Sequence, residues 1–134
     1  MRGLRLFVRP IERADDRDVR AFLDRETEDA EARLSNVACD PATAACGLLG
    51  KLLGDVVAVV AMEISGDAVR IHDLVVAREL RRKRIGRVMM REVEQLALKM
   101  DRRRLIVDDA RGAQEFLRRV GFIHEGERWV RVVS

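Results

Sequence analysis

The strongest chemical signal in the sequence is a run of basic residues that ends close to a glycine. The run 81–84 reads Arg-Arg-Lys-Arg, and Gly86 and Arg87 follow after one apolar residue. An apolar strand is expected over 74–76, just before the run, and an amphipathic helix just after it. The N-terminus of a helix offers unpaired backbone N–H groups and a partial positive charge. Strand, basic turn and helix together therefore predict a cradle for a phosphate or pyrophosphate, with a solvated basic loop as the alternative.

The distribution of charge supports this location for an anion. Residues 78–104 carry eleven basic and four acidic side chains, a net charge of +7, whereas residues 1–43 carry eight arginines and ten acids, a net charge of −2. The whole chain has a net charge of only +3. The basic excess is therefore concentrated in one segment.

Two polar residues near this segment are candidates for acid–base chemistry. His72 lies on the expected strand before the basic run, and imidazole is suited to removing a proton from an amine near neutral pH. Glu63 lies on the preceding expected strand and could share a sheet face with His72. Asp73 is expected to alternate to the opposite face, in a structural role. Each of these side chains also fits an ordinary solvent-facing strand residue.

Other polar residues give weaker signals. Asp108 and Asp109 follow a later expected strand and could contact a cationic substrate or cap a helix. The two cysteines, Cys39 and Cys46, fit no metal or redox spacing, and the chain has two histidines, so we expect no metal. The cysteines are expected to be reduced thiols in a cytoplasmic protein.

Length and composition set the class of protein. The chain has 134 residues, of which 48% are hydrophobic and 37% are charged, values that exclude a disordered chain and a membrane-embedded one. We expect a single domain over 1–134, with no secretory signal and no membrane span. The chain has no tyrosine, so a phenol is excluded as its catalytic acid.

Hydrophobic periodicity predicts an α/β (α+β) fold with the order β-α-α-β-β-β-α-β-α-β-β. The expected strands are 4–8, ended by Pro10, then 45–53, 56–64, 69–76, 105–107, 122–124 and 129–133. The first expected helix begins at Asp15 or Asp16, and the second covers 27–34. The third follows Gly86, and the fourth covers 113–120. Glycine turns after the second and third strands predict an antiparallel meander, and the later strand–helix–strand units predict parallel pairing. The sheet is therefore expected to be mixed and mostly antiparallel, with about seven strands and about four helices.

Two segments resemble the GNAT superfamily of N-acetyltransferases. Residues 71–89 resemble its acetyl-CoA-binding motif, a strand followed by Gln/Arg-x-x-Gly-x-Gly/Ala and a helix. Residues 113–122 resemble its second marker, a helix that ends in Gly-Phe, and residues 8–23 resemble its opening strand and helix. The resemblance covers nearly the whole chain in the family's order of elements, and it implies a GNAT-like sheet.

The resemblance also implies roles for particular residues. Arg81 matches the Gln/Arg position and Gly86 the second Gly/Ala position. The backbone N–H groups of 82–87 would hold the pyrophosphate, and the main chain of 74–76 would pair with the pantetheine arm and polarise the thioester carbonyl. The residues implied in cofactor binding are Leu74, Val75, Val76, Arg81, Arg82, Lys83, Arg84, Ile85, Gly86 and Arg87. His72 occupies a position where related sequences often carry glutamate, so His72 and Glu63 are the candidate catalytic residues.

Three residues depart from the family pattern. Arg84 replaces the first glycine of the motif, and Ala110 stands where the family often has an asparagine. Leu117 stands where the family usually places the tyrosine that protonates the coenzyme A thiolate. General acid catalysis is typically worth ~10²–10⁴-fold, so this last departure bears on rate more than on binding.

The resemblance implies an enzyme that transfers an acetyl group from acetyl-CoA to a primary amine of a small molecule or peptide, by direct attack on the thioester. An alternative is a GNAT-fold protein that binds an acyl-CoA as a sensor or interaction module with weak or absent catalysis. We do not expect nucleic acid as the partner, because the sequence lacks aromatic residues interleaved with its basic run. Similar proteins commonly dimerise through their final strands, so a homodimer is compatible with the resemblance.

Overall fold

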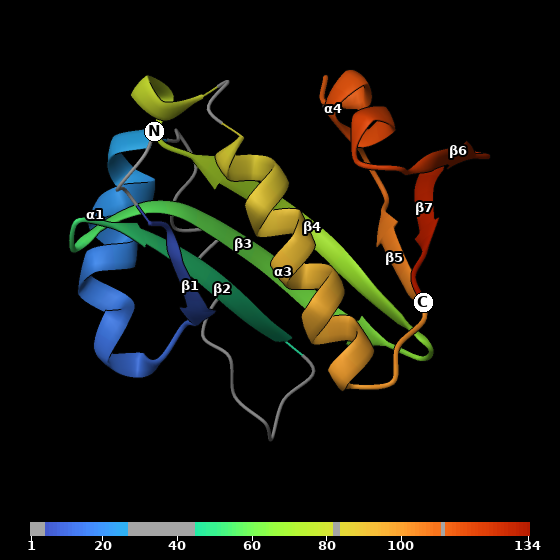
Figure 1. Ribbon diagram of the computed structural model, residues 1–134, viewed down its shortest axis with the longest axis horizontal. Helices are drawn as coiled ribbons and strands as arrows, with labels where there is room; N and C mark the ends of the chain where they lie inside the picture. The colour runs from blue at the N-terminus through green and yellow to red at the C-terminus, as the bar shows by residue number, and fades with distance from the viewer. Residues whose placement is uncertain (1–4, 27–44, 82–83, 111) are drawn as a thin grey trace.

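A seven-stranded mixed sheet forms the centre of the molecule (Figure 1). The computed structural model describes residues 5–26, 45–81, 84–110 and 112–134. The helix predicted over 27–34, Cys39, Arg82 and Lys83 lie outside the described residues. The spatial order of the strands is β1-β2-β3-β4-β5-β7-β6.

The elements follow the predicted order. The strands are β1 (Phe7–Pro10), β2 (Ala45–Leu52), β3 (Asp55–Ser65), β4 (Ala68–Val76), β5 (Arg104–Val107), β6 (Ile123–Glu125) and β7 (Arg128–Val132). The described helices are α1 (Asp16–Glu26), α3 (Ile85–Lys99) and α4 (Gln114–Arg119), with short 3-10 turns η1 (Arg13–Asp15) and η2 (Arg78–Leu80). The predicted mixed α/β class is confirmed. No described helix combines the length and the apolar character needed to cross a membrane.

The first strand lies later in the chain than predicted. Pro10 belongs to β1, opposite Leu48 of β2, instead of ending the strand before it. A proline is accommodated there because β1 is an edge strand and Pro10 is its last residue, so the missing N–H interrupts little of the ladder.

Helices pack on both faces of the sheet, and the side-chain alternation of β3 separates the two layers. On one face, Met89, Val93 and Ala97 of α3 are fully buried against a cluster that includes Val60 and Met62. On the other face, α1 buries Val19, Phe22 and Leu23 against a cluster that includes Val57 and Val59. The predicted amphipathic face of α3 is therefore confirmed. We call the two faces the α3 face and the α1 face.

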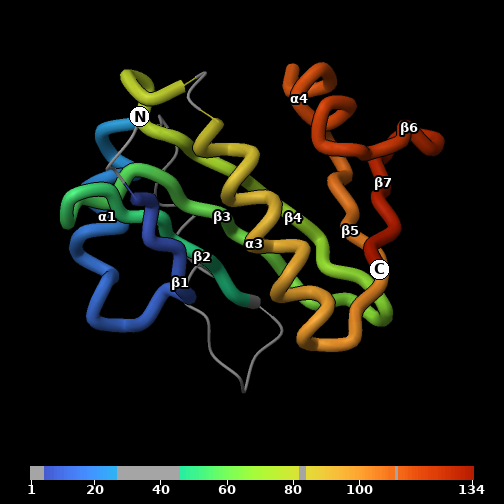
Figure 2. Tube along the Cα trace, in the orientation of Figure 1, coloured from blue at the N-terminus to red at the C-terminus, as the bar shows by residue number. Residues whose placement is uncertain are grey.

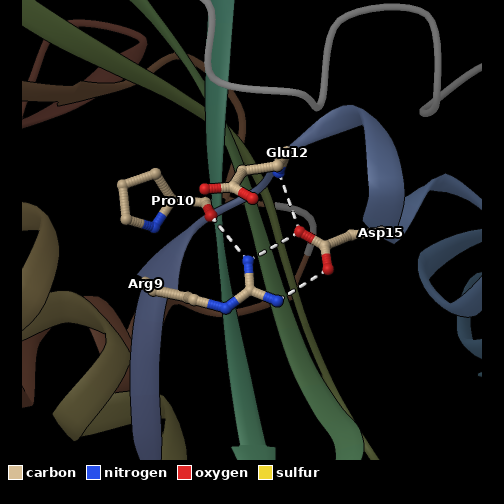
Figure 3. A network of polar contacts seen from close by, with 4 residues as sticks. All are labelled: Arg9, Pro10, Glu12 and Asp15. Carbon is tan, nitrogen blue, oxygen red and sulfur yellow. Dashed lines mark hydrogen bonds and ion pairs between the residues drawn. The ribbon is translucent and has the colours of Figure 1, made fainter.

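A partly buried ion pair joins β1 to the turn that precedes α1 (Figure 3). The guanidinium of Arg9 donates to both carboxylate oxygens of Asp15, at 2.7 and 2.6 Å, and the backbone N–H of Glu12 donates to the same carboxylate at 2.8 Å. Arg9 also donates to the carbonyl of Pro10 at 3.1 Å. The hydrogen bond from Arg9 is the largest influence that lowers the pKa of Asp15 from 3.8 to about 2, against the opposing effect of burial. Asp15 is thus held ionised in a largely buried position.

The sheet is joined at its middle by a short parallel ladder. Strands β1 to β4 pair antiparallel with their neighbours along their lengths, but β4 and β5 share three residue pairs, from Ala68↔Arg104 to Arg70↔Ile106. Beyond Arg70, β4 continues to Val76 with β3 as its strand partner among the described strands. Figures 1 and 2 show β5 diverging from β4 toward α4. The predicted parallel pairing is confirmed, and it leaves one edge of the second half of β4 unpaired by β5.

Candidate functional site

The start of α3 has the features of an anion site. Arg84 precedes the helix in a left-handed conformation (φ 66°, ψ 10°) and its side chain makes no capping hydrogen bond. The N–H of Val88 donates to the carbonyl of Arg84 at 3.0 Å, so helix geometry leaves the three N–H groups of 85–87 without an acceptor inside the helix. The first turn of α3 contains no acidic residue. Its partial positive charge is therefore not offset by the helix itself.

Three arginines surround this helix end. Arg81, Arg84 and Arg87 are each exposed, and none of them takes part in an ion pair within the described residues. A cation at the positive end of a helix is unfavourable by about 0.3–1 kcal/mol. Such an arrangement becomes favourable when an anion binds, because both the arginines and the helix N–H groups then face a negative charge. The predicted basic run therefore does meet the start of a helix, although Arg82 and Lys83 lie outside the described residues.

Gly86 lies at a close contact between α3 and α4, which could not be predicted from the sequence. A Cβ atom at Gly86 would meet Cε1 and Cζ of Phe116 at 3.2 and 3.3 Å and Cδ2 of Leu74 at 3.6 Å. The distances to Phe116 are tighter than an ordinary Cβ contact, so the glycine lets α3 approach α4 closely, whereas the distance to Leu74 is an ordinary contact. Phe116 was not singled out from the sequence, and its position one turn into the last predicted helix was the available signal. Ile85 and Gly86 begin the helix at the place where three elements meet.

The second half of β4 supplies main-chain groups beside this helix end. The side chains of Leu74 and Val76 pack with the cluster on the α3 face, whereas Val75 is buried on the α1 face. The N–H of Ala77 donates to Val57 at 2.8 Å, which holds the end of β4 against β3. Because this part of β4 does not pair with β5, its other edge can hydrogen-bond an extended ligand that carries amide groups.

His72 and Glu63 lie side by side on the sheet. Nε2 of His72 is 3.8 Å from Oε1 of Glu63, and the side chains are 52% and 44% exposed. This distance allows an ion pair when the imidazole is protonated, but it is longer than a hydrogen bond. The predicted shared face is therefore confirmed, and the pair remains open to solvent.

A β-bulge at His72 changes the alternation along β4. Ala61 pairs with Asp73 while Met62 pairs with Ile71, so His72 is an extra residue in the ladder. Ile71 packs on the α3 face before the bulge and Leu74 packs on that face after it. Alternation counted forward from Ile71 places His72 on the α1 face, and alternation counted back from Leu74 places Asp73 on the same face. The expectation that Asp73 alternates to the face opposite His72 is wrong, because the bulge adds one residue.

Asp108 is held by an arginine from the neighbouring strand. Nη1 of Arg70 donates to its two carboxylate oxygens at 2.6 and 2.7 Å. Arg70 also belongs to the last residue pair of the β4–β5 ladder. The ion pair therefore joins the two strands at the point where they separate. The N-cap of α4 is Ala113, so Asp108 does not cap that helix, and its side chain is 54% exposed.

Three residues of the second marker, Leu117, Val120 and Phe122, lie in the core, and most of the others are exposed. Leu117 is 3% exposed and belongs to the cluster on the α3 face, and Ala110 packs against the same cluster. The buried Leu117 has no polar atom on its side chain, so it offers no proton to a leaving group. No group of acidic, cysteine and histidine residues suited to a metal ion is found in the described part of the chain.

The family model and the solved structures that match this chain name the same protein family. The family model described as "Acetyltransferase (GNAT) family" matches residues 8–122. The sequence has no match among curated proteins. Among solved structures, a GNAT family N-acetyltransferase from Escherichia coli in complex with CoA has a TM-score of 0.79 at 17% identity, covering 100% of this chain and 84% of that one.

Two further structures show the same fold. A GNAT family acetyltransferase from Brucella melitensis in complex with acetyl-CoA has a TM-score of 0.72 at 14% identity, with 97% and 89% of the two chains covered. The ribosomal-protein-S18-alanine N-acetyltransferase from Escherichia coli has a TM-score of 0.75 at 12% identity, with 96% and 93% covered. The family match over residues 8–122, together with this fold, shows that the chain belongs to the GNAT family of acetyltransferases.

Proposed function

We propose that this protein is an N-acetyltransferase that moves an acetyl group from acetyl-CoA to a primary amine of a small molecule or peptide. The observation that carries the proposal is the start of α3, where three exposed arginines and three helix N–H groups meet without an acidic partner in the described residues. This donor set fits the diphosphate of acetyl-CoA. Membership of the GNAT family and the CoA complexes of similar structures support the same ligand.

The same proposal names the residues that would bind the cofactor. The N–H groups of Ile85, Gly86 and Arg87 would bind the diphosphate, and Arg81 and Arg84 add positive charge, together with Arg82 and Lys83 of the same run. The unpaired edge of β4 at Leu74, Val75 and Val76 would hydrogen-bond the pantetheine arm. When bound, acetyl-CoA supplies an acetyl group activated as a thioester.

His72 is the proposed general base, and the carboxylate of Glu63 lies beside it. The amine nitrogen attacks the thioester carbon, and its proton passes to Nε2 of His72 directly or through water. The C–S bond breaks, and the thiolate takes a proton from solvent because Leu117 offers none. A carboxylate 3.8 Å from the imidazole stabilises the positive charge that His72 gains.

Calorimetry with CoA and a thiol-release assay with acetyl-CoA test the proposal. The acceptor panel contains polyamines, amino acids, aminoglycosides and peptides with free N-termini. We expect saturable CoA binding and thiol release that depends on one acceptor class. A protein that binds no CoA, or that binds oligonucleotides in its place, would overturn the proposal.

A double variant locates the binding site. Arg81→Gln with Arg87→Gln removes two charges from the helix end, whereas Arg91→Gln removes one exposed charge further along α3 and serves as the control. We expect the double variant to weaken CoA binding by about tenfold or more and the control to leave it unchanged. A Gly86→Glu variant is a poorer test, because its side chain would crowd Phe116 as well as the ligand.

A second candidate function is a GNAT-fold sensor that binds acyl-CoA without efficient transfer. The observation that favours it is the buried leucine at the position of the thiolate-protonating residue, in a chain without tyrosine. Saturable CoA binding together with no thiol release across the acceptor panel would select this function.

A further inference from the structure

The Arg70–Asp108 ion pair lies at the point where β4 and β5 separate. Arg70 belongs to the last residue pair of the parallel ladder, opposite Ile106, and its Nη1 donates to both carboxylate oxygens of Asp108 at 2.6 and 2.7 Å. If the ladder continued, Asp108 would lie opposite His72. The ion pair therefore spans the end of the ladder, where one edge of β4 becomes free to bind a ligand.

Alternation places this ion pair on the same sheet face as the proposed general base. Val69 and Ile71 pack on the α3 face, so the Arg70 side chain starts on the α1 face. Its register partner on β3 is Glu63, and Oε1 of Glu63 is 3.8 Å from Nε2 of His72. The ion pair therefore borders the region where a thioester must lie if an amine beside His72 is to attack it.

The proposed course of acyl-CoA along β4 leads toward the ion pair. The proposed diphosphate site is at the start of α3 and the pantetheine arm pairs with residues 74–76, so the acyl group extends from there toward lower residue numbers. Arg70 lies six residues before Val76, which is about 20 Å along an extended strand. The acyl group is the last part of the ligand, so a longer chain comes closer to Arg70 and Asp108.

We propose that the Arg70–Asp108 ion pair limits the acyl group to a short chain, which makes Arg70 a specificity-determining residue. The inference rests on the proposed function. A methylene group that becomes buried normally strengthens binding by about fourfold. A chain that reaches the ion pair would instead displace or desolvate two charged groups held by short hydrogen bonds, so the added methylene groups would weaken binding.

The opposite end of the same ladder offers a matched control. Arg104 belongs to the first residue pair of the ladder, and its Nε is 3.3 Å from Oδ2 of Asp67. The Arg104 and Asp67 side chains are 35% and 65% exposed, against 28% and 54% for Arg70 and Asp108. Arg104→Ala therefore removes a similar ion pair at the end of the ladder that points away from the proposed ligand.

Calorimetry with CoA, acetyl-CoA and hexanoyl-CoA tests the inference. The proteins are the wild type, Arg70→Ala, Asp108→Ala and Arg104→Ala, and the quantity compared is the Kd of hexanoyl-CoA divided by that of acetyl-CoA. We expect a ratio of at least about ten in the wild type and below about three in Arg70→Ala, because alanine leaves no charged group in the path of the chain. Asp108→Ala should lower the ratio less, since Arg70 keeps its charge, and Arg104→Ala should keep the wild-type ratio.

The outcomes separate this inference from the proposed function. Wild-type protein that binds no CoA overturns both together, whereas wild-type protein that binds the two acyl-CoAs equally well overturns the inference alone. An unchanged ratio in Arg70→Ala also overturns it, even if all three ligands bind more weakly, because a uniform loss would mean that the ion pair only joins the strands. An equal fall in Arg104→Ala has the same meaning. The thermal midpoint without ligand checks that each variant folds, and Asp108→Ala tests the same ion pair if Arg70→Ala folds poorly.

Discussion

Arg9–Asp15 and His72–Glu63 are two acid–base pairs in one molecule, and they differ in almost every physical respect. Arg9 and Asp15 form two hydrogen bonds of 2.6 and 2.7 Å, and the Asp15 side chain is 8% exposed. His72 and Glu63 approach to 3.8 Å, and both side chains are about half exposed. The first pair uses its hydrogen-bonding capacity inside the protein, because Arg9 and Asp15 bond to each other and also to the carbonyl of Pro10 and the N–H of Glu12. The second leaves that capacity available to a ligand.

The difference indicates which pair stabilises the fold and which can do chemistry. Losing the short hydrogen bonds of a partly buried pair destabilises the protein, whereas an exposed pair contributes about 0–1 kcal/mol. A general base must accept a proton from outside the protein, so it needs access. The three variants that follow test this division.

The largest effect is expected from His72→Ala. Loss of a general base should lower kcat about 100-fold and remove most of its pH dependence, while CoA affinity and the free energy of unfolding stay as in the wild type. Steady-state kinetics over a range of pH, calorimetry and denaturant titration provide these measurements. His124→Ala is the control, because His124 stacks on Trp129 at 4.6 Å in the last hairpin. Equal kcat values for the two variants would show that His72 is an ordinary sheet residue.

Asp15→Asn should lower the free energy of unfolding by about 1–2 kcal/mol near neutral pH. The pKa of Asp15 is about 2 in the folded protein, and the ordinary value for this group is 3.8. The stabilisation is therefore present above pH 4 and is lost as the pH falls toward 2. The variant should therefore lose less stability than the wild type over that interval. Denaturant titrations between pH 2 and 7 measure the difference.

The control for this variant is Asp16→Asn, since Asp16 is exposed and pairs with Arg20 at 3.5 Å. It should change the free energy of unfolding by less than about 0.5 kcal/mol. Equal losses for the two variants would mean that the short hydrogen bonds to Asp15 contribute no more than a surface contact.

The smallest effect is expected from Glu63→Gln. The amide keeps the size of the side chain but removes the charge near His72, so kcat should fall by about two- to fivefold with little change in KM. Asp67→Asn, in the turn that joins the same two strands, is the control and should leave kcat unchanged. A loss for Glu63→Gln as large as that for His72→Ala would assign the carboxylate a direct part in proton transfer.

Much of the fold could be predicted from local patterns. The period of Met89, Val93 and Ala97 identified the buried face of α3, and glycines at 54 and 66 marked the turns of the meander. The location of the basic run before a helix was predicted for the same reason. These features depend on residues that are close in sequence.

The features that could not be predicted from the sequence depend on how distant segments align and pack against each other. The bulge at His72 is set by how β3 and β4 align, and it reversed the expected side of Asp73. Arg70 meets Asp108 across 38 positions of sequence, and Phe116 meets Gly86 because two helices converge. Pairings of this kind are decided by the packing of the whole sheet.

The three-pair ladder between β4 and β5 has a consequence for motion. The part of the molecule formed by β5, α4, β6 and β7 shares the hydrophobic core of the α3 face with the rest, but its strands pair with β4 over only these three residues. At this boundary the second half of β4 has no described strand on its β5 side, so its amide hydrogens are expected to exchange faster than those of β3. A ligand that hydrogen-bonds along β4 would act as a temporary strand, and it would slow exchange on both sides of the boundary at once.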